Sequence, residues 1–321
     1  MKKKLFVFFL LFSFPLHVFA YSNRLIVGGE PIGIEIHSKG VYVVDFYKIN
    51  DTYPGKDEGF KKGDIILEVN GENINSIDEL NRYISDEGDY SAVVYRNGKK
   101  INLMIHSFQN NNNIETGLYV KDVINGLGTL SYIDPTTSVF ASLGHEILES
   151  NSNRKFRMSD GLIYEVRLNY IHKSKDGNIG ELHANFMNHV RGNISKNELN
   201  GIYGIYTDTL SDFEEIDIGL ENEINLGEAF IRYSFDDTPK NYSIDILDIN
   251  NQEEVKNIFF EITDSDLLSK TGGIVQGMSG APILQNNKLV GVVNYVVIND
   301  SKKGYGVFIE KMLKEGDKLV S

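Results

Sequence analysis

The chain has 321 residues, a formal net charge of −13 at neutral pH and no cysteine. This length allows two domains with sizeable cores. An acidic chain without a clustered basic patch disfavours a nucleic-acid-binding protein. The absence of cysteine excludes disulfides, thiol chemistry and zinc sites of the cysteine type.

The N-terminus has the pattern of an export signal. Lysines at positions 2–4 precede the apolar run 5–14, and residues 18–20 fit a small-residue cleavage site. This pattern predicts a Sec-type signal peptide or N-terminal membrane anchor over residues 1–20. The apolar run is short for a membrane-spanning helix and is followed by Pro15, which favours cleavage over retention. Both alternatives predict that the rest of the chain is exported.

Residues 21–106 carry the pattern of a small domain with strands and one helix. Gly33–Ile36 and Gly40–Val44 predict strands around tight glycine turns, and residues 63–71 predict a strand that ends in an Asn-Gly turn. Ser76, followed three residues later by Glu79, predicts the capping box of a helix. This arrangement resembles a PDZ domain of the type found in bacterial proteases.

PDZ domains bind an extended peptide at a sheet edge, and backbone N–H groups hold its terminal carboxylate. The resemblance implies that the peptide-binding loop contains Ile32, Gly33 and Ile34. The alternative is a small β domain with a steric or autoinhibitory role and no free ligand. The asparagine-rich stretch 107–115 is predicted to be the linker to the next domain.

The remaining chain, residues 116–321, is rich in short strands and in glycine or asparagine turns. Apolar residues alternate with others in Ile163–Leu168 and again in Ala229–Phe235. This pattern fits a double β-barrel better than an α/β-hydrolase, which needs long helices around its nucleophile. The predicted fold is mainly β: a PDZ domain (α+β) followed by a trypsin-like double β-barrel peptidase domain.

His145 is the histidine with the setting of a catalytic base. It follows a strand, an Asp134-Pro135 turn and a second strand, and it leaves that strand through Gly144. A general base must be held rigidly, and a strand end does this. The alternative is a hydrogen-bonded histidine in a turn. His183 and His189 lie six residues apart and fit no metal-ligand spacing, and neither a metal nor another cofactor is predicted.

The segment Thr271–Ile283 has the pattern of a serine nucleophile loop. A serine nucleophile needs an exposed tight turn, backbone N–H groups that face the developing oxyanion, and a histidine that takes its proton. The Gly277-x-Ser279-Gly280 turn can supply the first two, with the N–H groups of Gly277 and Ser279 as the oxyanion hole. The alternative is an ordinary glycine-rich turn between strands.

An acid that could orient the histidine is less well defined. Asp264 lies at the end of an apolar strand-like run shortly before Ser279, and Asp266 is its close competitor. The alternative for either residue is to cap the short helix-like piece 266–270, which is the common role of aspartate at this kind of position.

Several blocks of the chain resemble the stage IV sporulation protein B family, the sporulation serine peptidases of spore-forming Firmicutes. The blocks are Thr271–Ile283, Asn299-Asp300, Gly304–Val307, Leu143–His145, Gly201–Gly204 and Leu25–Gly29. They occur in family order along nearly the whole chain. The resemblance implies that His145 is the general base, Ser279 the nucleophile and Asp264 the acid that orients the histidine.

The resemblance also implies a function. It predicts an exported serine endopeptidase that cuts itself and a protein regulator of a membrane-embedded metalloprotease, in the space between forespore and mother cell. This cleavage would lead to activation of a late sigma factor, and the PDZ domain would govern self-cleavage and targeting. Two alternatives remain: a PDZ adaptor on an inactive protease-like barrel, and an envelope quality-control serine protease.

Overall fold

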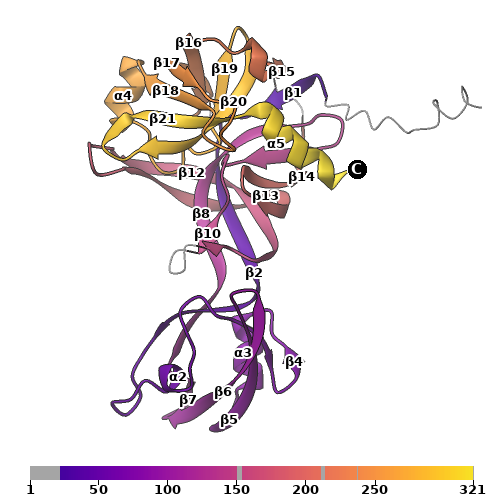
Figure 1. Cartoon of the computed structure of the whole chain (residues 1–321), viewed down its shortest axis with the longest axis vertical. Helices are drawn as coiled ribbons and strands as arrows, with labels where there is room; N and C mark the ends of the chain where they lie inside the picture. The colour runs from indigo at the N-terminus through magenta and orange to yellow at the C-terminus, as the bar shows by residue number, and fades with distance from the viewer. Residues whose placement is uncertain (1–21, 150–153, 211–213, 237, 321) are drawn as a thin grey trace, which may run out of the picture.

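The computed structural model describes residues 22–149, 154–210, 214–236 and 238–320. The predicted signal segment 1–20 therefore lies outside the described residues. Figure 1 shows two lobes joined by a narrow neck, through which β2 (Pro31–Phe46) and β8 (Leu118–Ile133) run. The prediction of a mainly β chain is confirmed, and the lower and upper lobes are called the PDZ lobe and the peptidase lobe after the two predicted domains.

The lower lobe in Figure 1 contains the second half of β2, the elements between β2 and β8, and the start of β8. The elements from the N-terminus to β8 are β1 (Arg24–Val27), β2 (Pro31–Phe46), α2 (Pro54–Asp57), β3 (Ile65–Val69), β4 (Glu72–Asn73), α3 (Ile77–Tyr83), β5 (Gly88–Arg96), β6 (Lys99–Asn110), β7 (Asn113–Glu115) and β8 (Leu118–Ile133).

Besides β1, the first half of β2 and most of β8, the upper lobe contains the elements that follow β8 in the chain. These are β9 (Val139–Ser142), β10 (Leu148–Glu149), β11 (Arg154–Lys155), β12 (Met158–His172), β13 (Glu181–Glu198), β14 (Gly201–Tyr206), β15 (Glu215–Ile218), η1 (Glu221–Glu223), β16 (Gly227–Tyr233), β17 (Lys240–Ile249), β18 (Ile258–Ile262), α4 (Ser265–Thr271), β19 (Pro282–Gln285), β20 (Lys288–Val297), β21 (Asp300–Phe308), α5 (Ile309–Gly316) and η2 (Asp317–Leu319).

Strand pairing in the upper lobe closes into two rings. The first ring runs β2–β8–β9–β14–β13–β12 and back to β2. The second runs β16–β17–β18–β21–β20–β19 and back to β16. Strands β1 and β15 connect the rings, because β1 pairs with β8 and β15 pairs with both β1 and β20. Closed rings of paired strands support the predicted double barrel of the trypsin type, which stays a prediction.

The lower lobe is the PDZ domain. Strands β3, β5 and β6 form its sheet with the second half of β2, and α3 packs on it. One half of the predicted capping box forms at α3, where Ser76 is the N-cap and its hydroxyl accepts from the Glu79 N–H at 3.1 Å. The Glu79 carboxylate in turn accepts from the Asn75 N–H at 2.8 Å. These bonds satisfy donors that a helix N-terminus would otherwise leave free.

The structure differs from the predicted arrangement, in which one domain simply follows the other along the chain. The segment Pro31–Phe46 was predicted as two strands around a turn, but it forms one long strand that contributes to both lobes. Its first half pairs with β12 in the first ring, and its second half pairs with β3 in the PDZ lobe. Gly40, with φ of +97°, lies between the halves, and a Cβ there would meet the Ile66 carbonyl oxygen at 2.6 Å. The PDZ lobe is thus inserted into the peptidase lobe between β2 and β8, and residues 24–38, which the predicted boundary at residue 21 assigns to the PDZ domain, lie with the strands of the peptidase lobe.

The predicted peptide-binding loop is also corrected. Ile32, Gly33 and Ile34 lie within β2, where β8 pairs on one edge and β12 on the other. Their backbone groups belong to sheet ladders, so they cannot hold a peptide carboxylate. Ile32 and Ile34 are buried in the core of the first ring. The alternation of isoleucines accounts for this burial, because a strand that is buried on one face needs an apolar residue at every second place.

The predicted linker 107–115 is mostly strand. Residues 107–110 end β6, which pairs with β7 in a hairpin, for example Phe108 with Glu115. Strand β8 starts directly afterwards, and its first residue, Leu118, is part of the PDZ core. The connection back to the peptidase lobe is therefore β8 itself, paired with β2 along the neck.

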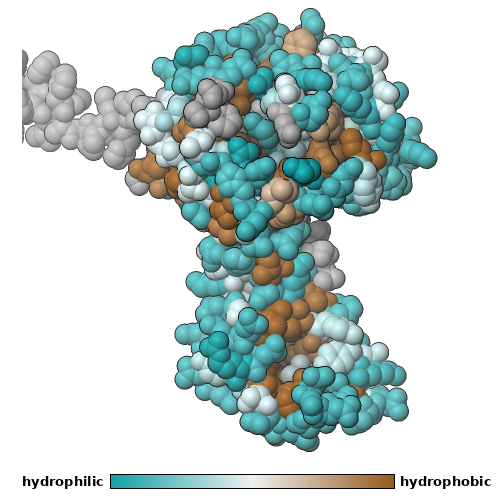
Figure 2. Space-filling model, turned by 180° about the vertical axis from the view of Figure 1, so that it is seen from behind, coloured by the Kyte–Doolittle hydropathy of each residue, from teal (hydrophilic) through white to brown (hydrophobic). Residues whose placement is uncertain are grey.

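Apolar surface on the PDZ lobe is visible from the opposite side of the molecule. Figure 2 shows apolar residues along the neck and on the lower lobe. Tyr83, Met104 and Tyr119 are among the exposed large apolar residues of this lobe.

Within the described ranges, no helix has both the length and the apolar character needed to cross a membrane.

Candidate active site

A cavity of about 480 Å³ brings the predicted base and nucleophile together. His145, Gly277 and Ser279 all line it. The other lining residues are mainly apolar and come from the neck strands, from the segment after β9 and from β20: Ile34, Ile124, Gly126, Leu127, Leu143, Glu146, Ile147, Leu148, Gln276 and Tyr295. Residues far apart in the sequence thus meet at one candidate site.

The nucleophile loop is held by side chains of β8. The Thr129 hydroxyl donates to the carbonyl of Gly277 at 2.8 Å, and the Ser131 hydroxyl donates to the carbonyl of Gly280 at 2.8 Å. The Thr129 N–H also donates to the carbonyl of Ser279 at 2.9 Å. Thr129 and Ser131 are fully buried. The loop therefore has one defined conformation, because leaving such buried carbonyls unpaired would cost about 1–3 kcal/mol each.

Gly280 lets the nucleophile loop and the histidine segment approach each other. Its φ is +96°, and a Cβ at this position would lie 2.3 Å from the Thr129 carbonyl oxygen and 2.5 Å from the Leu143 nitrogen. Only glycine fits this conformation and this spacing. Leu143 is two residues before His145, so the contact places the turn that carries the histidine directly against the turn that carries the serine.

The loop also has free backbone donors. Among the residues that the structure describes, none accepts a hydrogen bond from the N–H of Gly277 or Ser279, whereas the neighbouring N–H groups of Met278 and Gly280 donate to Val275 and Val293. Gly277 has a φ of +102°. Two free N–H groups beside the candidate nucleophile are what an oxyanion hole requires.

His145 is held in a defined tautomer. Its Nδ1 contacts the backbone carbonyl of Glu146 at 2.9 Å, and a carbonyl can only accept, so Nδ1 carries the proton and Nε2 has a free lone pair. The imidazole ring stacks on Tyr295, with ring centroids 5.6 Å apart. Burial lowers the pKa of His145 below the usual histidine value, and the interactions with Glu146 partly oppose this effect. A neutral imidazole with a free Nε2 is the form that accepts a proton from a serine.

The Ser279 hydroxyl is only weakly bonded in this structure. It donates to the carbonyl of Asn294 at 3.4 Å, which is near the limit for a hydrogen bond. Such a weak bond leaves the hydroxyl free to change its hydrogen-bond partner. Catalytic hydrogen bonds are often long or absent in a free enzyme and form when substrate binds.

The structure does not place Asp264 beside the histidine. Asp264 is the N-cap of α4: its carboxylate accepts from the N–H of Leu267 at 2.9 Å and from the N–H of Ser243 at 3.3 Å. It does not line the cavity. The predicted acid is thus corrected to a helix cap, the alternative that its position before α4 allowed. The competitor Asp266 pairs with Lys270 at 3.0 Å, one turn later on α4.

The residues that hold the nucleophile loop and the imidazole in place were not predicted from the sequence. Thr129 and Ser131 precede the histidine on β8 and have no motif of their own, and Tyr295 lies in an apolar strand after the serine. Small hydroxyl residues inside an otherwise apolar strand were the available signal, since a buried hydroxyl needs a partner.

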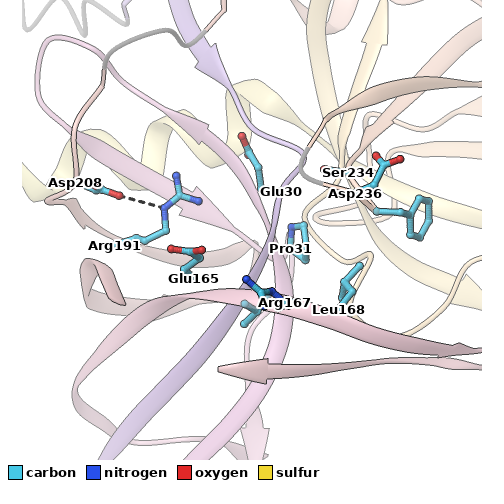
Figure 3. Close-up of a pocket in the computed structure, with 11 residues that line it drawn as sticks. Glu30, Pro31, Glu165, Arg167, Leu168, Arg191, Asp208, Ser234 and Asp236 are labelled. Atoms are coloured by element: carbon cyan, nitrogen blue, oxygen red, sulfur yellow. Dashed lines mark ion pairs between the residues drawn. The ribbon is translucent and has the colours of Figure 1, made fainter. Parts of the chain in front are cut away.

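A second cavity, of about 510 Å³, lies elsewhere in the peptidase lobe. Figure 3 shows charged residues around it, with Arg191 paired to Asp208 at 3.6 Å. Glu165 on its wall pairs with His189 at 2.7 Å. Neither His145 nor Ser279 lines this cavity. The predicted catalytic residues therefore share the smaller cavity and not this one.

Two models of known protein families match the chain. The sequence model of the SpoIVB peptidase S55 family matches residues 112–313, and a PDZ domain model matches residues 31–106. The chain belongs to the SpoIVB peptidase S55 family. It is therefore a serine peptidase that acts on peptide bonds and carries a PDZ domain. A search of curated proteins finds no match.

Membership of the S55 peptidase family agrees with the chemistry of the cavity. A serine hydroxyl, an imidazole with a free Nε2 and two free N–H groups line or adjoin the same space. Within the described residues, no group of histidine and carboxylate side chains could hold a metal ion. The PDZ domain and the peptidase fold imply protein ligands or protein substrates.

Proposed function

We propose that this chain is an exported sporulation serine endopeptidase in which Ser279 is the nucleophile and His145 the general base. The single observation that carries the assignment is the cavity that both residues line, beside the free N–H groups of Gly277 and Ser279. Membership of the S55 family supports the sporulation role.

The mechanism follows from the contacts at this cavity. Nε2 of His145 takes the proton of the Ser279 hydroxyl while Oγ attacks the scissile carbonyl. The N–H groups of Gly277 and Ser279 donate to the resulting oxyanion, and one such donor contributes about 10²–10³ in rate. His145 then gives its proton to the leaving amine, and water releases the acyl group by the same route in reverse. No carboxylate is needed to set the tautomer, because the Glu146 carbonyl already accepts from Nδ1.

The biological role is part of the same proposal. The substrates are the chain itself and a protein regulator of a membrane-embedded metalloprotease, in the space between forespore and mother cell, and the cleavage leads to late sigma-factor activation. The export signal over residues 1–20 supports this location. The PDZ domain binds a peptide segment that targets the enzyme or controls its self-cleavage.

The test is mass spectrometry of the purified wild-type protein and of Ser279→Ala, each incubated alone over time. The expected result is fragments that appear only with the wild type, and their ends identify the bond that is cut. Fragments at equal rates from both proteins would mean that another residue or a contaminant cleaves the chain. Two proteins that stay intact would contradict self-cleavage.

A further inference from the structure

Strand β8 is shared by the catalytic cavity and the PDZ lobe. Its N-terminal residue Leu118 lies in the PDZ core, while Ile124, Gly126 and Leu127 line the cavity of His145 and Ser279. Strand β2 pairs with β8 along one edge over this whole stretch. The opposite edge of β8 gains a strand partner, β9, only from Leu130 onward. In the described part of the chain, this opposite edge carries no strand between Leu118 and Gly128.

The edge that each backbone N–H and C=O group faces can be assigned along this part of β8. The Leu130 N–H donates to Glu30, on the β2 side, whereas the Thr129 N–H donates to the carbonyl of Ser279, on the opposite side. Successive residues of a strand direct their N–H and C=O groups to alternate edges. With the unbroken register between Thr129 and Val123, the backbone groups of Leu127, Asn125 and Val123 face the unpaired edge.

This edge lies at the catalytic site. Thr129 bonds the Ser279 carbonyl, and Leu127, two residues earlier, is the next residue whose N–H and C=O face the same way. Ile124, Gly126 and Leu127 line the cavity on this side, and Ile147 and Leu148 line it as well. Asn125 and Gly126 are exposed. A free strand edge with exposed residues beside a nucleophile is a template for an added strand.

We propose that the substrate polypeptide next to the scissile bond binds as an added β-strand on this edge of β8, with hydrogen bonds to the backbone of Leu127, Asn125 and Val123. The proposal rests on the proposed function of Ser279 and names the surface that holds its substrate. The occupant is an extended, unfolded segment, since only an extended chain can continue a sheet edge. Apolar side chains next to the cut bond fit the apolar cavity wall.

The same edge leads the substrate toward the PDZ domain. Val123 to Leu127 spans roughly 13 Å of strand, and the next residue toward the PDZ lobe, Asp122, accepts from the Ile77 N–H at the start of α3 at 2.7 Å. The PDZ helix is thus fixed to the strand that binds substrate. A substrate that extends beyond Val123 would therefore approach the start of α3 in the PDZ lobe.

The test uses proline to remove one N–H from the free edge. Asn125→Pro deletes the donor that faces the substrate and no ladder bond, because proline is tolerated at edge positions whose N–H faces away from the sheet. Asn125→Ala is the matched control, since it removes the same side chain and retains the N–H. The probe is a synthetic peptide that spans the bond cut during self-incubation, and the measured quantity is kcat/KM.

The expected result is a roughly tenfold lower kcat/KM for Asn125→Pro than for Asn125→Ala, the upper end of the effect of one lost hydrogen bond. Labelling of Ser279 by a small fluorophosphonate, which needs no strand contact, should proceed at the same rate in both variants. Equal kcat/KM values for the two variants would overturn the proposal. Absence of both cleavage and labelling in the wild type would instead contradict the proposed function of Ser279.

If the fluorophosphonate also labels Ser279 slowly in Asn125→Pro, the substitution has disturbed the active site. A second measurement then tests whether the peptide binds on the β8 edge. Hydrogen exchange of the Ser279→Ala protein is followed with and without the same peptide. Binding on the β8 edge should slow exchange of the amides in segment 119–128. Unchanged exchange there at saturating peptide would overturn the proposal.

Discussion

The nucleophile turn and the histidine turn of this peptidase are held in different ways. The turn at Ser279 is fixed from outside by two buried hydroxyl groups and a backbone N–H of β8. Among the residues that the structure describes, the imidazole of His145 is oriented by the carbonyl of the adjacent residue, Glu146, and by stacking on Tyr295. The oxyanion side of the site is therefore built into the sheet, whereas the base depends on local chain geometry.

This difference indicates which step the fold prepares in advance. Backbone donors that are already in place cost no reorganisation when negative charge develops. A carbonyl at Nδ1 fixes the tautomer but stabilises the imidazolium less than a carboxylate would, and this fits the lowered pKa of His145. The site thus relies more on oxyanion stabilisation than on a strong base.

Removal of the base should have the largest effect. His145→Ala should lower kcat/KM on the self-cleavage peptide by about 10²–10⁴, the usual contribution of a general base. His172→Ala, which removes an exposed histidine of β12, is the control and should match the wild type. Wild-type kcat/KM for His145→Ala would show that another group accepts the proton.

Loosening the nucleophile turn should have an intermediate effect. Thr129→Val retains the side-chain shape but leaves the Gly277 carbonyl without its hydroxyl donor, which should lower stability by about 1–3 kcal/mol. We expect kcat/KM to fall about tenfold as well, because the oxyanion donors lose their fixed position. Urea unfolding and peptide kinetics measure the two effects. A stability loss with unchanged kcat/KM would mean that the Thr129 bond does not position the catalytic donors.

The lowered pKa of His145 predicts the pH profile. The neutral imidazole is the active form, so activity should fall as the pH drops through the pKa of the folded enzyme. Since burial lowers that pKa, the midpoint of the acidic limb of kcat/KM should lie below the usual value of about 6.5. The unfolded chain binds the proton more readily, so stability should also decline as the pH falls from about 6.5. A midpoint clearly above 6.5 would indicate a carboxylate close to the imidazole.

The smallest catalytic effect is expected at Asp264. Asp264→Ala should destabilise the protein by about 1 kcal/mol through loss of the α4 cap. Asp264→Ser retains a capping oxygen and should have nearly wild-type stability and kcat/KM. The role implied by the family resemblance predicts otherwise: loss of a carboxylate that orients the histidine should reduce kcat by about 10⁴. Thermal unfolding and peptide kinetics of the two variants separate a cap from a catalytic acid.

The sequence indicated much of this site because its chemistry is local. The glycines around Ser279 and the tight exit before His145 are motif features, and the structure brings both residues to one cavity. Asp264 could not be assigned in this way, since an aspartate before a short helix has the same sequence pattern whether it caps the helix or faces a histidine. Its position became clear only from its bonds to Leu267 and Ser243.

The insertion of the PDZ domain was harder to predict from the sequence than the catalytic residues, for a physical reason. The segment Pro31–Phe46 has apolar alternation on both sides of Gly40, which suits two strands around a turn and also one long strand with a change of direction. The choice is made by partners distant in sequence, since β12 and β8 pair with the first half and β3 with the second. Local pattern carries no information about such partners, so the insertion of the PDZ domain was visible only in the fold.

The most direct test of the catalytic assignment is labelling with a fluorophosphonate, followed by mapping of the adduct by mass spectrometry. We predict a single adduct on Ser279 in the wild-type protein, a much slower reaction in His145→Ala, and an undiminished reaction in Asp264→Ser. An adduct on a different serine, or rapid labelling of Ser279 without His145, would contradict a catalytic pair formed by these two residues.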